Sequence, residues 1–152
     1  MANTRFEEVY KNFLNSIQDY RIKRLFEEEP SVADDMLCMF LETAVSKFVT
    51  CRKPIASTDF SQGEFNSELD LQEKIILKDC MILAWMEWVI NDITQMNWAL
   101  NDNDFKHYSE EKNLREKSEY TDRLREKVNQ DMMEYDIAHT PFADWGMGNF
   151  GL

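Results

Sequence analysis

The chain has few of the residues that interrupt regular structure or bind metal ions. Four glycines and three prolines in 152 residues favour long regular elements over a loop-rich fold. The cysteines, Cys38, Cys51 and Cys80, form no CxxC motif, so we expect no disulfide framework, and Cys38 and Cys80 are predicted to be small core residues. The two histidines, His107 and His139, have no HExxH spacing, which argues against a zinc site.

Basic side chains are also scarce. The chain has 17 Lys and Arg against 29 Asp and Glu, giving a net charge of −12 and a pI near 4.6. A nucleic-acid-binding protein needs a basic surface that displaces counterions from phosphates, so sequence-specific DNA binding is not predicted. The excess of acidic residues either keeps the protein soluble or has a specific role in its function.

No segment of the chain resembles a secretion signal or a membrane span. The first residues, MANTRFEEVYKNF, are charged and lack the apolar core of a signal peptide. The longest apolar run is too short to cross a bilayer and has charges on both sides. We therefore expect a soluble intracellular protein with no membrane partner.

The apolar residues that are present concentrate in the stretch from Leu71 to Leu100. From Met81 to Ile90 every residue except Glu87 is apolar or aromatic. A helix that is apolar on nearly all sides must be surrounded by other elements. Asp70 and Glu73 have the spacing of a capping box at its start. The stretch is therefore predicted to be a central buried helix.

Three further helices are predicted around this one. Residues 4–27 have an apolar face with Asn3 or Thr4 as the cap, and Glu29-Pro30 closes the helix. Residues 31–49 follow after a short turn, with Ser31 as the cap and Asp34 and Asp35 in the first turn, so these two helices should form a hairpin. The fold class is therefore all-α, a bundle of about four helices.

The last of these helices, residues 105–135, has sparse apolar positions between dense charges of both signs. This pattern predicts a narrow seam against the central helix and a free end that projects beyond it. The seam residues are Phe105, Tyr108, Leu114, Tyr120, Leu124, Val128, Met132 and Tyr135. Residues 50–70 are predicted to be a loop, with Ile55, Phe60, Phe65 and Leu69 as anchors, and a short extended pair within it stays open.

The chain is expected to divide into a helical body, residues 1–135, and an extended C-terminal arm, residues 136–152. The arm, DIAHTPFADWGMGNFGL, loses the helical pattern but carries more apolar residues than disordered tails do. Such an arm docks on its own domain or on another chain, and the pattern does not separate the two. The predicted partner-binding residues are Ile137, Pro141, Phe142, Trp145, Met147, Phe150 and Leu152.

Motifs for catalysis or cofactor binding are missing. Gly146-Met147-Gly148 lacks the lysine and the following helix of a phosphate loop. Cys51 precedes Arg52 and Lys53, which in principle lower a thiol pKa, although a loop cysteine without function is the simpler interpretation. Trp85, Trp88 and Trp98 suit core packing better than a stacking platform for bases. No enzyme, metal or cofactor is therefore predicted.

The segment from Phe65 to Tyr120 resembles the neck or head-to-tail connector proteins of tailed bacteriophages. The resemblance is carried by Phe65 and Leu69 before the capping box, by the Met81–Trp88 centre and by the Asn101–Leu114 stretch. It implies a helical adaptor in the virion neck, made in the host cytoplasm, that forms a ring beneath the portal protein. The ring is expected to be dodecameric, with the arm on the portal or neck proteins and DNA passing through the channel.

A second hypothesis is a small acidic intracellular binder, such as an inhibitor that mimics DNA and blocks a host nucleic-acid enzyme. A DNA mimic needs carboxylates regularly spaced over one exposed surface. Lys and Arg alternate with Glu along the predicted last helix, which argues against it. A monomer or dimer in solution would favour the inhibitor, and a ring would favour the connector.

Overall fold

The computed structural model describes residues 2–17, 20–99 and 104–141, without the side chains of residues 20–21, 93–99 and 104–111. The described residues form helices and no strand, which confirms the all-α class. The helices are α1 (Phe6–Ser16), α2 (Tyr20–Glu28), α3 (Pro30–Lys47), α4 (Leu71–Ala99) and α5 (Asp104–His139), with the short 3₁₀ helices η1 (Ile55–Ser57) and η2 (Phe60–Gln62).

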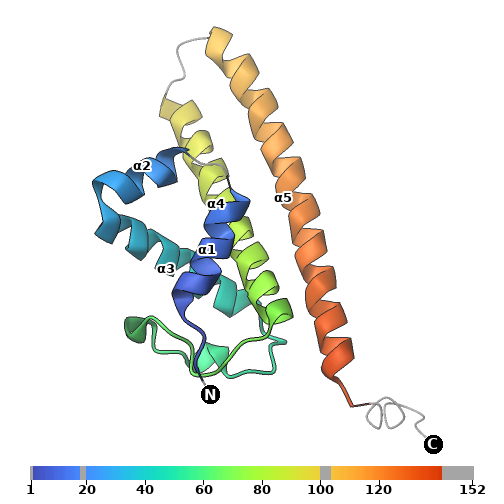
Figure 1. Cartoon of the computed structure of the whole chain (residues 1–152). Helices are drawn as coiled ribbons and strands as arrows, with labels where there is room; N and C mark the ends of the chain where they lie inside the picture. Colours follow the sequence, from blue (N-terminus) through green and yellow to red (C-terminus); the bar gives the residue numbers. More distant parts are fainter. Residues whose placement is uncertain (1, 18–19, 100–103, 142–152) are drawn as a thin grey trace, which may run out of the picture.

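Helix α4 is the centre of the fold, as predicted (Figure 1). It packs against α1 and α3 in the lower half of the molecule and against α5 along its length, whereas α2 packs on α3. The predicted capping box is confirmed, because the Glu73 N–H donates to Asp70 Oδ1 and the Asp70 N–H to Glu73 Oε2, each at 2.8 Å. Leu77, Cys80 and Met81 are fully buried, and burying a side chain of the size of Leu77 or Met81 stabilises the fold by about 1.5–3 kcal/mol.

The single helix predicted over residues 4–27 is wrong, because the chain forms two helices there. The backbone at Ile17 is extended, with φ −112° and ψ 149°, and α2 starts at Tyr20. Ile17 and Ile22 are both buried, at 6% and 3% exposure. In one continuous helix these positions would lie about 140° apart, so the break allows both side chains to reach the core.

Two predicted helix caps and one first-turn assignment are also wrong. Arg5, not Asn3 or Thr4, precedes α1, and the buried Thr4 hydroxyl accepts a hydrogen bond from the Leu69 N–H at 2.8 Å. Pro30 is the first residue of α3, a position where its missing N–H costs nothing, so Ser31 lies inside the helix. Asp34 and Asp35 are exposed but lie beyond the first turn of α3.

The loop between α3 and α4 crosses the lower end of the bundle (Figure 1). The predicted anchors are confirmed: Ile55, Phe65 and Leu69 are buried, and the ring of Phe60 lies 5.5 Å from that of Phe6. Its described residues pair in no extended hairpin, and its β-type contact is an isolated bridge between Arg5 and Glu64. The loop is therefore held by side chains and by contacts to the start of α1.

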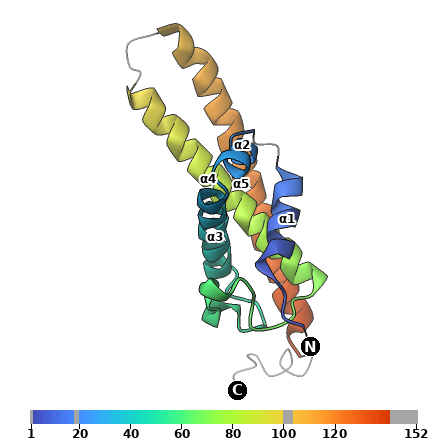
Figure 2. The same cartoon turned by 60° about the vertical axis from the view of Figure 1, so that its left-hand side comes forward.

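Helix α5 packs along α4, as predicted, and runs antiparallel to it (Figure 1). Both helices continue beyond the layer of α1–α3, whereas the prediction was that α5 alone projects beyond α4 (Figures 1 and 2). The narrow seam is confirmed at Leu124, Val128 and Tyr135, which are buried, whereas Tyr120 is 46% exposed. Phe105 and Tyr108 lie where side chains are not described. The helix ends at His139 rather than at residue 135.

Not all predicted core residues are fully buried. Cys80 is fully buried, but Cys38 is half-buried and its thiol donates to Glu42 Oε1 at 3.6 Å. Trp85 and Trp88 are half-buried against the core, and the ring of Trp88 lies 6.4 Å from that of Phe40. These two tryptophans therefore serve packing, as predicted, and the side chain of Trp98 lies outside the described part.

Candidate partner-binding site

The structure describes two of the seven predicted partner-binding residues. Ile137 is 47% exposed and lies in the last turn of α5, not in an extended arm. Pro141 is exposed and follows directly after Thr140. The other five lie outside the described residues: Phe142, Trp145, Met147, Phe150 and Leu152. The extended arm predicted over residues 136–152 therefore starts at least four residues later than expected.

Arg52 fixes the end of α5 to the loop. Its guanidinium donates to Asp136 Oδ1 at 2.6 Å, to Thr140 Oγ1 at 3.2 Å and to the Asp136 carbonyl at 3.4 Å. The Thr140 hydroxyl donates to the same carbonyl at 2.7 Å. A cation at the C-terminus of a helix satisfies its free carbonyls and the negative end of its dipole. These bonds explain why the helix continues beyond residue 135.

A buried polar network lies one turn before this helix end. The Tyr135 hydroxyl donates to Glu73 Oε1 at 2.8 Å and accepts from the Arg52 N–H at 3.0 Å. Tyr135 and Glu73 are 0% and 1% exposed. Burial raises the pKa of Tyr135, so its hydroxyl keeps the proton that it donates. The network therefore ties α5, the start of α4 and the loop together.

Cys51 lies beside this network, and its pKa is raised rather than lowered. Burial is the main cause, and it outweighs the hydrogen bond from the Lys53 backbone. The basic neighbours Arg52 and Lys53 therefore do not activate the thiol, contrary to the possibility raised by the sequence. Burial also raises the pKa of Cys80, to about 12, and that of Cys38. No neighbouring cation therefore activates any of the three thiols.

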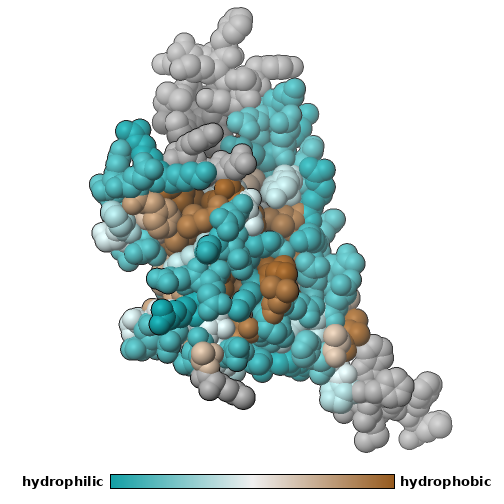
Figure 3. All heavy atoms as spheres, viewed as in Figure 1, coloured by the Kyte–Doolittle hydropathy of each residue, from teal (hydrophilic) through white to brown (hydrophobic). Residues whose placement is uncertain are grey.

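Apolar side chains reach the surface next to the end of α5. Met133 and Ile137 are 63% and 47% exposed and lie four residues apart, on one face of the helix. Figure 3 shows apolar side chains at the surface over the lower end of α5. These two residues form an apolar surface near the end of α5, and the exposed Pro141 follows two residues after the helix.

A second apolar surface lies between α1 and α2. Leu14, Ile17, Ile22 and Phe26 line a groove of about 300 Å³ there, with Lys23 and Glu27 at its rim. Figure 3 shows this apolar area beside α1 and below α2. Unlike scattered apolar side chains, a continuous apolar groove is typical of a docking surface.

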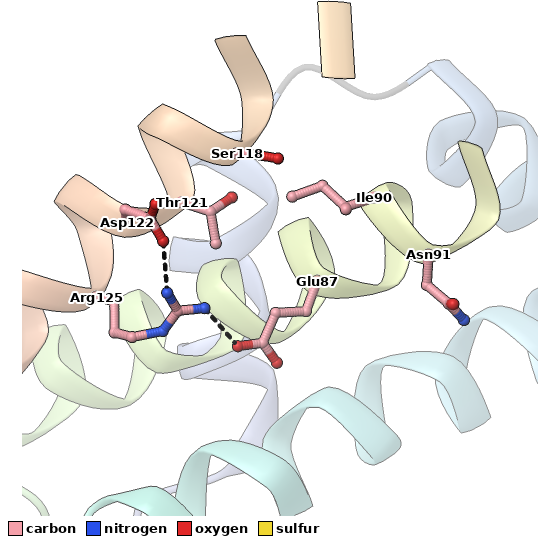
Figure 4. Close-up of a pocket in the computed structure, with 7 residues that line it drawn as sticks. All are labelled: Glu87, Ile90, Asn91, Ser118, Thr121, Asp122 and Arg125. Carbon is pink, nitrogen blue, oxygen red and sulfur yellow. Dashed lines mark hydrogen bonds and ion pairs between the residues drawn. The ribbon is translucent and has the colours of Figure 1, made fainter. Parts of the chain in front are cut away.

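The upper part of the α4–α5 seam holds a polar notch of about 360 Å³. Figure 4 shows Glu87 of α4 and Arg125 and Asp122 of α5 pointing toward one another, whereas Asn91 points away. Arg125 pairs with Asp122 at 2.7 Å and with Glu87 at 3.3 Å, and Lys47 of α3 also pairs with Glu87 at 3.3 Å. These charges are paired with one another, so the notch links three helices rather than offering an acid or base for catalysis.

A stronger charged contact joins the two helices lower down. Asp79 is 3% exposed, and its carboxylate pairs with Lys127 of α5 and with the adjacent Lys78, each at 3.0 Å. The hydrogen bond to Asp79 is the main reason why the pKa of Lys127 is raised. A buried carboxylate needs such partners, because an unpaired charge inside a protein costs several kcal/mol.

We expect the contribution of Lys127 to the free energy of unfolding to be lost at alkaline pH. A raised pKa means that the stabilisation is complete below the ordinary lysine value of 10.5 and is lost as the pH rises through the folded-state pKa. At pH 8, Lys127→Met should lower the free energy of unfolding by about 1 kcal/mol, a value discounted because the lysine is 59% exposed.

The measurement is urea unfolding of both proteins from pH 7 to 11.5, with the difference between them plotted against pH. The difference should stay constant up to about pH 10 and then shrink. Lys112→Met, which removes an exposed lysine from the same helix, is the control for net charge. A difference that grows with pH would contradict the assigned pair.

The described residues contain neither a metal-binding cluster nor a membrane-spanning helix. Within these ranges, no three His, Cys, Asp or Glu side chains come together in a way that would hold a metal ion. None of the helices in the described part has the length and apolar character needed to cross a membrane.

Three comparisons, with known protein families, with curated proteins and with solved structures, find no significant match. The resemblance to phage connector proteins therefore stays a prediction. Sequence reasoning missed Arg52 and Tyr135 as the residues that anchor the arm. Their partners lie 84 and 62 residues away in the chain, so the helical spacing that marks Tyr135 as a seam residue does not reveal these hydrogen bonds.

Proposed function

We propose that this protein is a non-enzymatic structural subunit, a head-to-tail connector in the neck of a tailed phage. The observation that supports it best is the anchored end of α5. Arg52, Tyr135 and Glu73 fix that helix end to the body, and a segment rich in apolar residues follows it. A rigid base with an apolar extension suits a subunit that joins two neighbours.

Ring formation is the second element of the proposal. A closed ring needs head-to-tail contacts, in which two different surfaces of each subunit meet. The body offers two apolar surfaces on different elements, one on α5 around Met133 and Ile137 and one between α1 and α2. The proposed assembly is a dodecameric ring beneath the portal protein, with the C-terminal segment bound to the portal or neck proteins.

The net charge of −12 fits a channel through which DNA passes without sequence-specific binding. An acidic wall repels phosphates and so lowers friction on a moving duplex. The proposed location is the virion neck, between capsid and tail. A basic or neutral lumen in the assembled ring would contradict this part of the proposal.

The test is mass measurement followed by electron microscopy. The purified chain is measured alone and after mixing with the portal protein of the same genome, because a portal can template a ring from monomeric subunits. We expect ring-shaped density added to one end of the portal. A chain that stays monomeric or dimeric and never adds to the portal would contradict the proposal.

The acidic-inhibitor alternative has one observation in its favour. Five exposed carboxylates gather around the α2–α3 turn: Glu27, Glu28, Glu29, Asp34 and Asp35. Arg24 pairs with Glu28 at 2.8 Å and neutralises part of this cluster. A stable monomer that inhibits a host nucleic-acid enzyme, and loses inhibition when these residues become Gln or Asn, would favour the alternative.

A further inference from the structure

A third groove lies at the lower end of the bundle, between the end of α3 and η1. Its volume is about 570 Å³, the largest among the grooves described above. The polar side chains at its edge include Glu42 and Lys53, and most of the lining is apolar. The apolar lining includes Val45, Phe48, Val49, Pro54, Ile55 and Phe60. Val49 is 82% exposed, so this apolar surface extends beyond the groove.

The C-terminal segment begins beside this groove. Cys51 and Lys53 line it, and Arg52 between them holds Asp136 and Thr140 at the end of α5. The Thr50 hydroxyl also donates to the Met132 carbonyl at 3.5 Å. The described residues therefore end at Pro141 next to the groove, and the eleven residues from 142 to 152 would span at most about 36–40 Å if extended.

We propose that residues 142–152 of the same chain occupy this groove in the free protein. The segment carries Phe142, Trp145, Met147 and Phe150, which match the apolar lining. Its acidic side chain, Asp144, would be attracted by Lys53 and repelled by Glu42 at the edge of the groove. The α1–α2 groove has a similar pair of charges, Lys23 and Glu27, so the closeness of the α5 end to the α3–η1 groove, and not charge, decides between them.

Docking within one chain is favoured over docking on a second copy, because the segment is tethered close to its groove. A segment tethered beside its groove has an effective concentration in the millimolar range, far above the micromolar concentration of other copies in solution. A partner of the C-terminal segment would then have to displace it from the groove. This inference concerns the free chain alone and does not depend on the proposed connector function.

The groove contains a native reporter, because Cys51 lines it. Gly148→Cys, in the full chain with Cys38→Ala, provides a second thiol in the C-terminal segment. Cys80 stays in place, since it is fully buried. After mild oxidation at micromolar protein concentration, we expect a disulfide between positions 51 and 148 within a monomer, seen by non-reducing gel and peptide mapping. Gly146→Cys places the second thiol two residues earlier and so tests a different alignment of the segment in the groove.

The matched control keeps Cys38 and carries Cys51→Ser instead, because Cys38 lies on α3 outside the groove lining. Its C-terminal thiol should form no disulfide within the chain. Disulfide-linked dimers in place of the intrachain bond would overturn the proposal in favour of a second copy. A thiol that links to neither Cys51 nor a second chain would mean that the groove is not occupied by this segment.

A second measurement does not depend on disulfide geometry. The rate at which a bulky thiol reagent labels Cys51 is compared between the full chain and a chain ending at Pro141, both with Cys38→Ala and at one pH. We expect labelling to be several-fold faster in the shorter chain, and Trp145→Ala to give an intermediate rate. Equal rates in all three proteins would overturn the proposal.

Discussion

Tyr135→Ala is expected to lower the free energy of unfolding by about 4 kcal/mol, near the top of the range for single substitutions. Tyr135 is fully buried, and its ring lies 5.1 Å from that of Phe48 and 4.1 Å from that of His139. Alanine removes these ring contacts and leaves the Glu73 carboxylate and the Arg52 N–H without the partner that the phenol supplies. The measurement is urea unfolding followed by circular dichroism at pH 7.

Tyr135→Phe separates the hydrogen bonds from the packing. It keeps the ring but leaves Glu73 Oε1 facing an apolar ring edge, so we expect a loss of about 2 kcal/mol. Tyr120→Phe is the matched control on the same helix, because Tyr120 is 46% exposed, and it should change the free energy by less than about 0.5 kcal/mol. If Tyr135→Phe were as harmless as the control, the buried network would contribute nothing to stability.

The parts of the fold that the sequence predicted depend on local patterns. Asp70 and Glu73 lie three residues apart, so their reciprocal capping was visible in the chain, and α4 begins where the pattern placed it. The apolar run from Met81 to Ile90 likewise marked the central helix before its neighbours were known. Helical spacing also identified Leu124, Val128 and Tyr135 as the residues that bury α5.

The parts that were missed depend on contacts between distant residues. The helix pattern over residues 4–27 is locally sound, but burying both Ile17 and Ile22 requires the break between α1 and α2. Thr4 has the chemistry of a cap, yet its hydroxyl accepts from Leu69, which lies 65 residues away. Local propensity assigns the Thr4 hydroxyl to a helix cap, but in the folded protein it binds the distant Leu69 N–H instead.

The same limit applies to the candidate site. The composition of residues 136–152 indicated an apolar segment for partner binding, but its first four residues belong to α5. Arg52 stabilises the end of α5 beyond residue 135. The sequence around Asp136 does not show that an arginine from the loop binds there. The Arg52 contacts hold the last turn of α5, because the helix end cannot fray without breaking its hydrogen bonds to the loop.

Removing residues 142–152 is expected to abolish binding to the portal protein while leaving the body folded. If the aromatic residues of this segment are the anchors of the contact, their loss should weaken binding by at least about 100-fold, or about 3 kcal/mol. Arg52 keeps both Asp136 and Thr140 in this shortened chain, so its circular dichroism should match that of the full chain. Binding is measured by sedimentation with portal rings and by electron microscopy.

A longer deletion, of residues 137–152, provides the contrast that assigns the loss to the segment. It also removes Thr140 and the last turn of α5, so it should lower the free energy of unfolding by a further 1 kcal/mol or so. Both deletions should lose portal binding equally, although only the longer one loses stability at the helix end. Trp145→Ala should reproduce most of the binding loss, whereas Met133→Ala, on the exposed face of α5, should leave binding by the C-terminal segment intact. Normal attachment by the chain that ends at Pro141 would show that the contact lies on the helical body, and the apolar surfaces of α5 and of the α1–α2 groove would then be the sites to mutate.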